Sequence, residues 1–259
     1  MSPTPRSTVR RLPALAVDDR EVVAAILDAG LVAHGGISHD GAPVVIPMAY
    51  ARVGGAVYLH GSVASRMMRN LSSGDPMYIT VTVVDGIVLA RSAFNMSMNY
   101  RAVVVQGAAR VVTEDGERMT AFRAIMDHFV PGHWDHVRPP NAQELRQTLV
   151  VATDLDEASA KVSVGPPRDE PEDLALPRWA GEIPLRTVAG TPRPDDHVPG
   201  GSSHPNPCAA TRAGLPRRRY RAAEDVALHR QGSRGTGDRR RDLHRRARDG
   251  RVALCAAAR

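Results

Sequence analysis

The sequence predicts a mainly β fold with peripheral helices, in which short antiparallel strands form a closed or partly closed barrel. Short apolar runs rich in β-branched residues are separated by turn signals that contain Gly, Asp or Pro, and most of these runs follow one another without a helix between them. No regular alternation of strand and helix is present, which argues against a doubly wound parallel sheet. With 259 residues, the chain is long enough for one domain with a substantial core.

The expected elements follow from apolar periodicity and from the residues that interrupt it. Residues 1–16 are expected to form a loose arm, after which Asp18 or Asp19 can cap a helix that Gly30 ends. Asp-Gly pairs at 40–41 and 85–86 are typical of hairpins. The predicted strands cover residues 31–37, 43–52, 56–60, 77–84, 87–93, 100–113 and 149–155, with a further element near 161–164, and the later helices cover 114–129 and 141–148.

Composition excludes several classes of protein. No apolar run of 18 residues exists, so we expect no membrane span, and no apolar segment follows the first arginines as it would in a secretory signal. Both cysteines lie in the last 60 residues, which excludes a disulfide framework or a cysteine-based metal site in residues 1–199. A cytoplasmic protein is therefore expected.

The segment YLHGSVASRMMRNL, residues 58–71, predicts a strand that passes through a tight turn into a helix. The turn brings Ser62, Ser65 and Arg66 to the start of that helix. Hydroxyl groups, free backbone N–H groups and a guanidinium suit a phosphate group, so one interpretation is a phosphate-binding cradle. The alternative is an ordinary helix that Ser62 caps, with Arg66 in solvent.

A second stretch of interest is ARSAFNMSMNYRAVVVQG, residues 90–107. Its loop gathers serine, asparagine and tyrosine side chains between two strongly apolar strands. Such a loop either lines a site or forms a wide hairpin with solvated side chains.

Several separated motifs occur in an order that resembles a known family. They are YLHGSVASRM, the Asp-Gly pair at 85–86, LARSAFNMSMNYR, and the late ASAKV and WAG. This order is similar to that of the flavin-nucleotide-binding branch of the pyridoxamine 5′-phosphate oxidase-like superfamily, and in particular to the group that includes nitroimidazole-resistance reductases. The resemblance covers about residues 8–199, and it implies a split β-barrel that forms a homodimer with FMN at its interface.

The resemblance also implies which residues contact the cofactor. Ser65 and Arg66 match the segment that binds the FMN phosphate, and the strand that contains Pro47 would pass under the isoalloxazine ring. Because proline has no N–H, Pro47 favours an edge strand or a bulge. Trp179 either stacks near the ring or packs in the core or dimer interface. The implied cofactor-binding residues are Val45, Ile46, Pro47, Met48, His60, Gly61, Ser62, Ser65, Arg66, Met67, Asn99, Tyr100, Arg101 and Trp179, of which residues 99–101 would reach the flavin of the partner subunit.

Two departures from the family pattern affect the expected activity. The region 184–188 lacks the Arg-x-His element with which true pyridoxamine phosphate oxidases hold their substrate, so that reaction is not expected. Asn95 and Met96 stand where relatives often carry a histidine pair. The expected function is therefore an oxidoreductase that uses FMN, with a reduced nicotinamide as donor and a small, unidentified molecule as acceptor. No catalytic residue is assigned.

Three alternatives stay open for the function. One is a flavin-binding protein without catalysis, and another is a deazaflavin-binding member of the same fold. The third is a haem-binding member, for which His60 is the candidate axial ligand. A metal site at His128, His133 and His136 is not expected, because Pro131 and Gly132 interrupt any helix between these histidines. Lys161 is expected on the surface.

The last 60 residues differ in composition from the rest of the chain. Residues 1–199 contain 19 basic and 23 acidic residues, whereas residues 200–259 contain 15 arginines and five acidic residues. Such a segment is a disordered natural tail, a basic arm for nucleic acid, or the product of a frameshift in GC-rich DNA. The frameshift is favoured because the family resemblance stops near residue 199, and nucleic-acid binding is disfavoured because Tyr220 is the only aromatic residue there.

Overall fold

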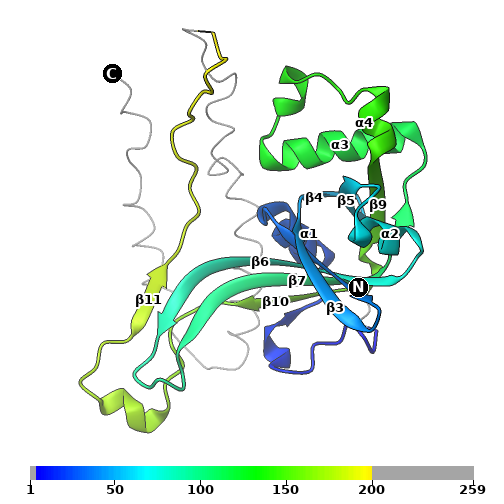
Figure 1. Ribbon diagram of the computed structural model, residues 1–259. Helices are drawn as coiled ribbons and strands as arrows, with labels where there is room; N and C mark the ends of the chain where they lie inside the picture. The colour runs from blue at the N-terminus through cyan, green and yellow to red at the C-terminus, as the bar shows by residue number, and fades with distance from the viewer. Residues whose placement is uncertain (1–3, 200–259) are drawn as a thin grey trace.

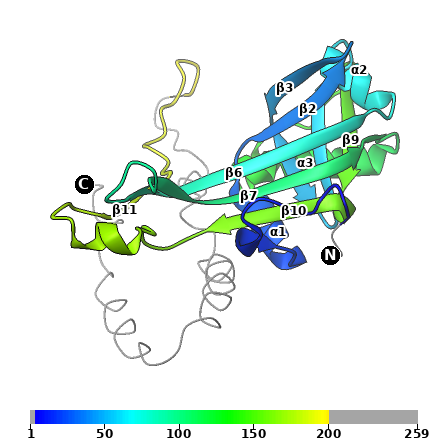
Figure 2. The same cartoon turned by 90° about the horizontal axis from the view of Figure 1, so that it is seen from below.

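The computed structural model describes residues 4–199 and contains two antiparallel sheets (Figures 1 and 2). The sheets do not close into one continuous barrel, so the predicted antiparallel fold is confirmed in its open, split-barrel form. The first sheet contains, in spatial order, β1 (Ala16–Val17), β10 (Ala158–Ser163), β7 (Ser97–Ala108), β6 (Pro76–Leu89), β2 (Ala33–His39) and β3 (Ala42–Met48), with β11 (Gly181–Pro184) also paired to β6.

The second sheet and the helices complete the fold. The second sheet contains β4 (Tyr50–Val53), β5 (Ala56–Ser62), β9 (Thr148–Asp154) and β8 (Arg110–Val111), in that order. The α-helices are α1 (Arg20–Ala29), α2 (Arg66–Ser72), α3 (Asp115–Phe129) and α4 (Ala142–Gln147). Short 3₁₀ turns cover Pro13–Leu15, His133–His136, Leu155–Glu157 and Pro171–Ala175. Within residues 4–199, no helix has the length and apolar character that a membrane crossing requires.

Helix α1 closes the core between the two sheets. The Asp19 carboxylate accepts hydrogen bonds from the backbone N–H groups of Glu21 and Val22, which confirms it as the N-cap. The apolar face of α1, including the fully buried Ile26 and Leu27, packs against strands of both sheets. This face carries the periodicity that predicted the helix, so the same residues that form the helix also place it.

Gly30 ends α1 by close packing. Its φ of −69° lies outside the left-handed region, so conformational freedom is not the reason for glycine here. A Cβ atom at this position would lie 2.2 Å from Val81 Cγ1 and 2.9 Å from the Tyr50 hydroxyl oxygen. The last turn of α1 is held instead by Tyr50, whose hydroxyl donates to the carbonyl oxygen of Leu27 at 2.5 Å, and by His128 Nε2, which lies 2.7 Å from the Gly30 carbonyl oxygen.

The predicted hairpin at residues 40–41 is confirmed. Asp40 and Gly41 have φ angles of 51° and 75°, the pair of left-handed residues that a tight two-residue turn requires, and this turn joins β2 to β3. Strand β3 is the edge of its sheet, as the proline at position 47 predicted. The residues that follow leave this sheet.

The prediction of one strand over residues 43–52 is wrong, because the chain changes sheet at Ala49. Strand β3 belongs to the first sheet and β4 to the second. Tyr50 is fully buried directly after the change, which turns the chain into the core. The predicted strand 100–113 divides in the same way, since β7 ends at Ala108 and β8 continues in the other sheet. A sequence pattern cannot separate the two sheets, because apolar alternation continues through both crossings.

The Asp85-Gly86 pair does not form the predicted turn. Strand β6 runs through it without a break, and the pairing of β6 with β7 shifts register between Val84 and Gly86, which is a β-bulge. The Asp85 carboxylate accepts two hydrogen bonds of 2.7 Å from the Arg101 guanidinium on β7. The chain therefore extends as a long two-stranded ribbon beyond the barrel, with β11 paired at its far end (Figures 1 and 2).

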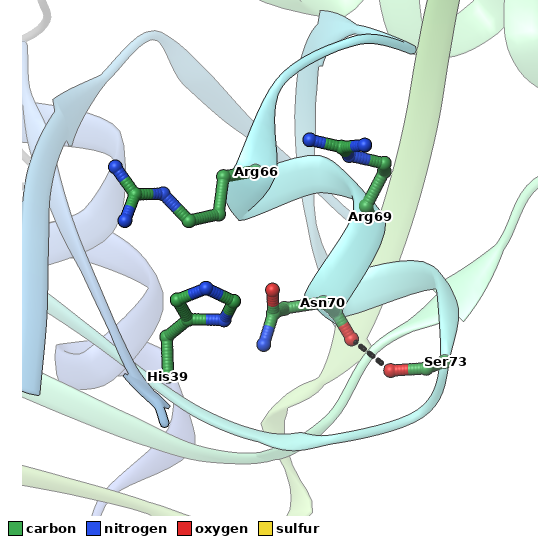
Figure 3. A pocket seen from close by; sticks show the side chains of 5 residues that line it. All are labelled: His39, Arg66, Arg69, Asn70 and Ser73. Carbon is green, nitrogen blue, oxygen red and sulfur yellow. Dashed lines mark hydrogen bonds between the residues drawn. The ribbon is translucent and has the colours of Figure 1, made fainter. Parts of the chain in front are cut away.

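A second apolar layer forms where α3 covers the second sheet. Ala121 of α3 packs with Val150 and Ala152 of β9. The Glu114 side chain caps α3 and Asn141 caps α4, the latter with a complete capping box that includes Glu144. The two predicted helices are confirmed to within one residue at their beginnings. Helix α2 packs its buried face into the same core as α1, and its outer face lines the pocket shown in Figure 3.

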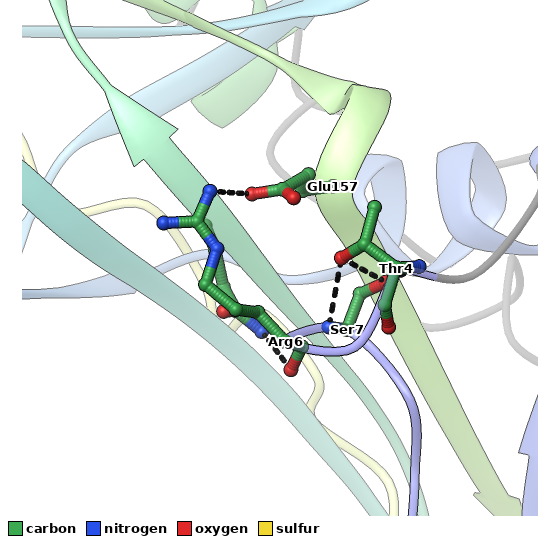
Figure 4. A network of polar contacts seen from close by, with 5 residues as sticks. Thr4, Arg6, Ser7 and Glu157 are labelled. Atoms are coloured by element: carbon green, nitrogen blue, oxygen red, sulfur yellow. Dashed lines mark hydrogen bonds and ion pairs between the residues drawn. The ribbon is translucent and has the colours of Figure 1, made fainter.

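The N-terminal segment from residue 4 onward contacts the first sheet, although the sequence predicted a loose arm. Ser7 is buried, Gln106 Nε2 donates to the Arg6 carbonyl oxygen at 2.9 Å, and Arg6 forms an ion pair with Glu157 (Figure 4). Strand β1 then pairs with β10. Polar residues that looked solvated in the sequence are held by side chains far along the chain. The predicted tail at 200–259 lies outside the described residues.

Candidate functional site

A short turn separates β5 from α2 and decides which serine caps the helix. The backbone N–H of Ser65 donates to the Ser62 carbonyl oxygen at 2.9 Å, and the N–H of Ala64 donates to Ser62 Oγ at 3.2 Å. The helix therefore begins at Arg66, with Ser65 as N-cap, and not at Val63 as the periodicity predicted. The Ser65 side chain makes no capping hydrogen bond. Its hydroxyl is available to a ligand.

One face of α2 is buried and the other carries cationic side chains. Met67, Met68 and Leu71 lie in the core. Arg66 and Arg69 point away from the core on successive turns. Together with residues of β2 and of the segment after the helix they line a pocket of about 470 Å³, the size of a small-ligand site (Figure 3). The lining residues are His39, Arg66, Arg69, Asn70 and Ser73.

The two arginines have no anionic partner among residues 4–199. None of the ion pairs in this part of the chain includes Arg66 or Arg69. Like charges three or four residues apart destabilise a helix. Guanidinium groups bind phosphate with two parallel hydrogen bonds. The pocket is thus suited to a phosphate-bearing ligand through its side chains, and α2, with seven residues, contributes little through its dipole.

Sequence reasoning found Arg66 but missed the other four lining residues. Arg69 could have been found, because a residue three positions after Arg66 lies on the same helix face. His39 could not, because its place depends on the β2–β3 hairpin lying beside α2. The imidazole of His39 lies 3.4 Å from the Asp40 carboxylate at the rim.

Two glycines of the strands lie against the buried methionines of α2. Only 2% of Met67 is exposed, and a Cβ atom on Gly35 would lie 2.9 Å from Met67 Cε. A Cβ atom on Gly61 would lie 2.8 Å from Met68 Cγ. The two glycines therefore allow the methionines of α2 to pack against the strands. The side chain of Met67 is thus a core residue, and its implied contact with the cofactor stays a prediction.

The edge strand β3 presents apolar side chains to solvent. Val45 is 65% exposed and Ile46 is 37% exposed, whereas Met48 is partly buried against the core. In the register of the two strands, Val45 lies opposite Gly36 of β2, which has no side chain, and Pro47 lies opposite His34. An exposed apolar edge suits the flat face of an aromatic ligand.

His60 belongs to β5, and its ring faces α3. Its ring stacks edge-on against Phe122, with 5.9 Å between ring centroids. Its Nδ1 atom is buried without a hydrogen-bond partner among the described residues. Burial lowers the pKa of His60 below its ordinary value, so the imidazole is neutral. A neutral imidazole with an unused nitrogen is the form that binds a metal ion.

Asn99, Tyr100 and Arg101 lie on the ribbon, away from α2. Asn99 Nδ2 donates to the Gly165 carbonyl oxygen at 3.2 Å, and Arg101 is committed to the bulge at Asp85. Their contact with the flavin of a partner subunit stays a prediction. Lys161 Nζ donates to a backbone carbonyl of the N-terminal segment, as a surface residue can.

Trp179 precedes β11 at the far end of the ribbon, and 68% of it is exposed. Both ribbon views place β11 far from α2 (Figures 1 and 2). Within one chain the predicted site residues therefore divide into two groups. One surrounds α2, β3 and β5, and the other lies on the ribbon.

The histidines of the α3 region do not gather into a metal site in residues 4–199, where no group of three potential ligands occurs. His133 and His136 have ring centroids 6.3 Å apart. His128 contacts the end of α1 and stacks on Tyr50.

The described residues thus form an open split barrel with a cationic pocket beside an apolar sheet edge. The family model described as pyridoxamine 5′-phosphate oxidase matches residues 19–162, which is more than half of the chain. The chain belongs to this family. No curated protein matches it.

Two solved structures are similar over most of their length. The flavocytochrome Anf3 from Azotobacter vinelandii is 38% identical, with a TM-score of 0.76, and the match covers 82% of this chain and 98% of that one. The FAD and heme binding protein from Mycobacterium smegmatis is 36% identical, with a TM-score of 0.71, and covers 74% and 94%. A putative 5-nitroimidazole antibiotic resistance protein from Bacteroides thetaiotaomicron is 19% identical, with a TM-score of 0.46, and covers 57% and 86%.

Proposed function

We propose that this protein binds a flavin nucleotide and acts in electron transfer or oxidoreduction, with the flavin phosphate held by Arg66. The observation that carries the proposal is the pocket over α2, where two guanidinium groups lack an anionic partner in the described part of the chain. Ser65 adds a hydroxyl that no capping bond uses. The family and the two similar structures, a flavocytochrome and an FAD and heme binding protein, support the flavin.

The sheet edge beside the pocket supports the position of the ring system. Among residues 4–199, strand β3 has one edge without a neighbouring strand, so backbone groups of the segment from Val45 to Met48 on that edge can meet the polar edge of a flavin. Val45 and Ile46 offer apolar contact. A bound flavin would supply reversible hydride or electron transfer, while the protein supplies binding and orientation.

A relative favours FAD over FMN in this proposal. The expected cofactor from the sequence was FMN, and the Arg66 pocket suits the phosphate of either nucleotide. One of the two similar structures is named for FAD. We infer FAD as the natural flavin, with a reduced nicotinamide or another electron donor and a small acceptor.

A homodimer completes the proposal. The far end of the ribbon and β11 expose apolar side chains that the rest of the described chain does not cover, which is a feature of protein interfaces. These residues are Ile87, Phe94, Met96, Met98, Trp179 and Ile183. In the loop that joins β6 to β7 at the tip of the ribbon, Arg91 Nε and Asn95 Nδ2 are buried donors without partners among residues 4–199. A second copy would cover this surface and bring Asn99, Tyr100 and Arg101 near its own flavin site.

The first test is the absorbance spectrum of the purified protein and of its Arg66→Ala variant, each titrated with FAD and FMN. We expect flavin bands at close to one per chain, and a loss of affinity of about tenfold or more in the variant, since a charged hydrogen-bonding partner of the phosphate is removed. Arg146→Ala, an exposed arginine on α4, is the control and should bind normally. A colourless wild-type protein that binds neither flavin would refute the proposal.

Steady-state oxidation of a reduced nicotinamide then separates an enzyme from a flavin-binding protein without catalysis. Consumption of the nicotinamide above the rate of free flavin supports an oxidoreductase. A flavin-loaded protein without turnover with any donor would leave only binding.

A second candidate function is haem binding, and His60 favours it. The residue is neutral, one of its ring nitrogens has no partner in the described chain, and Phe122 covers its ring. Imidazole is a common axial ligand of haem iron, and haem would supply one-electron chemistry beside the flavin. Both similar structures are named as haem proteins or flavocytochromes.

Haem binding is tested by the Soret band after addition of hemin to the full-length protein. We expect the Soret band to shift to the position of an imidazole-ligated haem. In His60→Ala the band should lie elsewhere, and added imidazole should partly restore its position. His34→Ala, an exposed histidine on β2, should leave the spectrum unchanged. An unchanged spectrum in His60→Ala would exclude His60 as the ligand.

A further inference from the structure

The turn before α2, residues 62–65, is held by backbone hydrogen bonds, because none of its four residues is buried. The backbone N–H of Val63 donates to the Gln147 carbonyl oxygen at 3.1 Å. Since Ser62 of β5 pairs with Thr148 of β9, this bond extends the pairing of the two strands by one step into the turn. The direction in which the chain enters α2 therefore depends on where Gln147 lies.

Gln147 is the last residue of α4, a helix of six residues of which none is buried. A capping box orders the beginning of α4. At its other end, the carbonyl groups of the last turn have no partners within the helix. Because apolar burial contributes little to its position, α4 needs a polar anchor at the end that meets the turn.

Arg118 of α3 supplies this anchor. Its Nη2 atom donates to the Leu145 carbonyl oxygen at 2.5 Å and lies 3.4 Å from the Thr148 carbonyl oxygen. Arg118 also forms an ion pair with Asp115, but 84% of the Asp115 side chain is exposed, and such surface pairs contribute little. Only 19% of the Arg118 side chain is exposed, so its guanidinium is directed mainly at the last carbonyl groups of α4.

Helix α3 gives Arg118 a fixed base. Ala121 lies three positions after Arg118, on the same helix face, and it is fully buried against β9 of the second sheet. Ile125, one turn further, is also buried. A continuous series of contacts therefore leads from the second sheet through α3, Arg118 and the end of α4 to the turn before α2.

We propose that Arg118 is a positioning residue for the flavin site, because it holds the end of α4 and thereby the turn from which Arg66 meets the ligand. This inference rests on the proposed function. Arg118 does not line the pocket over α2, so it acts through the turn and not by contact with the flavin. Without its guanidinium, the end of α4 loses its anchor, and the Val63 N–H loses a fixed acceptor. Arg66 then occupies its binding geometry for less of the time.

The first measurement is the dissociation constant of FAD for the full-length protein after its flavin is removed. Arg118→Met keeps the apolar stem and removes the guanidinium, and we expect it to weaken FAD by about fivefold. Arg118→Lys keeps a charged donor and should retain most of the affinity. Arg123→Met is the matched control on α3, where 52% of the side chain is exposed, and it should bind normally. A thermal melt checks that each variant is folded.

A double-mutant cycle shows whether Arg118 acts through Arg66. In the Arg66→Ala background, Arg118→Met should change FAD affinity by less than about twofold, because the residue that it positions is already absent. An equal loss of affinity with and without Arg66 would overturn the positioning role, as would an unchanged affinity of Arg118→Met in the wild-type background.

Hydrogen exchange gives a second reading that needs no flavin. Peptides that cover residues 62–66, followed by mass spectrometry, should exchange faster in Arg118→Met than in the wild type, and Arg123→Met should not change them. Unchanged exchange in Arg118→Met would overturn the proposal whatever its flavin affinity. If Arg118→Met melts abnormally, Arg118→Gln is read by the same measurements, and wild-type affinity or exchange in it would overturn the proposal.

The two readings separate the positioning role from the flavin function. A wild-type protein that binds no flavin would refute the proposed function, and exchange would then decide the role of Arg118 alone. Faster exchange of the turn in Arg118→Met would still support Arg118 as the residue that holds it. Normal flavin binding by the wild type and by Arg118→Met would leave the function intact and remove Arg118 from the site.

Discussion

Gly30 leaves no room for a side chain at the end of α1. A Cβ atom there would lie 2.2 Å from Val81 Cγ1, far inside van der Waals contact, and both groups are in the core. The neighbouring Tyr50 cannot give way easily, because its hydroxyl holds the carbonyl oxygen of Leu27. Glycine is therefore required at position 30 for close packing, a requirement that neither composition nor turn preferences can predict.

We predict that Gly30→Ala lowers the free energy of unfolding by about 1 to 3 kcal/mol, the usual cost of overpacking a core. Urea denaturation followed by circular dichroism measures it. Gly55→Ala is the control, because no atom of the described residues lies within 4 Å of a Cβ atom at that position. Equal stability of the two variants would show that the core adapts to the added methyl group.

The β6–β7 ribbon depends on a bulge and on the ion pair that spans it. Arg101 is almost completely buried on β7, and the Asp85 carboxylate at the bulge meets it with two hydrogen bonds. The bulge lets the ribbon continue where the Asp-Gly pair would otherwise turn it back. Gly86 allows the close approach of β11, since a Cβ atom there would lie 3.2 Å from the Ile183 carbonyl oxygen.

We predict that Asp85→Ala lowers the free energy of unfolding by about 3 kcal/mol, because a buried guanidinium loses its carboxylate. Chemical denaturation measures the loss, and amide exchange should rise in the ribbon. The double variant Asp85→Ala with Arg101→Met should recover part of the stability. Full stability of the single variant would mean that Arg101 finds another acceptor.

The complete protein is expected to be larger than one chain. The ribbon carries an exposed apolar surface beyond the barrel, and buried donors at its tip have no acceptors in residues 4–199. Burying such a surface against a second copy removes apolar area from water and supplies the missing partners. It would also unite the two groups of predicted site residues that one chain holds apart.

We predict a dimeric mass by light scattering, and a shift towards the monomer in Ile183→Glu. The charge would be placed on β11 in the proposed interface, and flavin occupancy should fall with dimer content. Val137→Glu, a partly exposed apolar position before α4, is the control. A wild-type monomer with full flavin occupancy would refute a shared site.

Most elements could be predicted because their signals are local. Asp19, Glu114 and Asn141 cap their helices with their own side chains, and the hairpin at Asp40-Gly41 needs only two residues in the left-handed region. Arg66 could be found for the same reason, since it directly follows the capping serine.

What the sequence determined by itself is the class of fold, the caps of α1, α3 and α4, the turn at Asp40-Gly41, and a cationic segment at the start of α2. Only the tertiary structure decided that Ala49 separates two sheets, that Asp85 bulges instead of turning, and that His39 of β2 lines the same pocket as the arginines of α2. These features depend on partners distant in the chain, such as Arg101 for Asp85. Local propensity is set by neighbours within a few residues, whereas register, sheet membership and pocket composition are set by long-range packing.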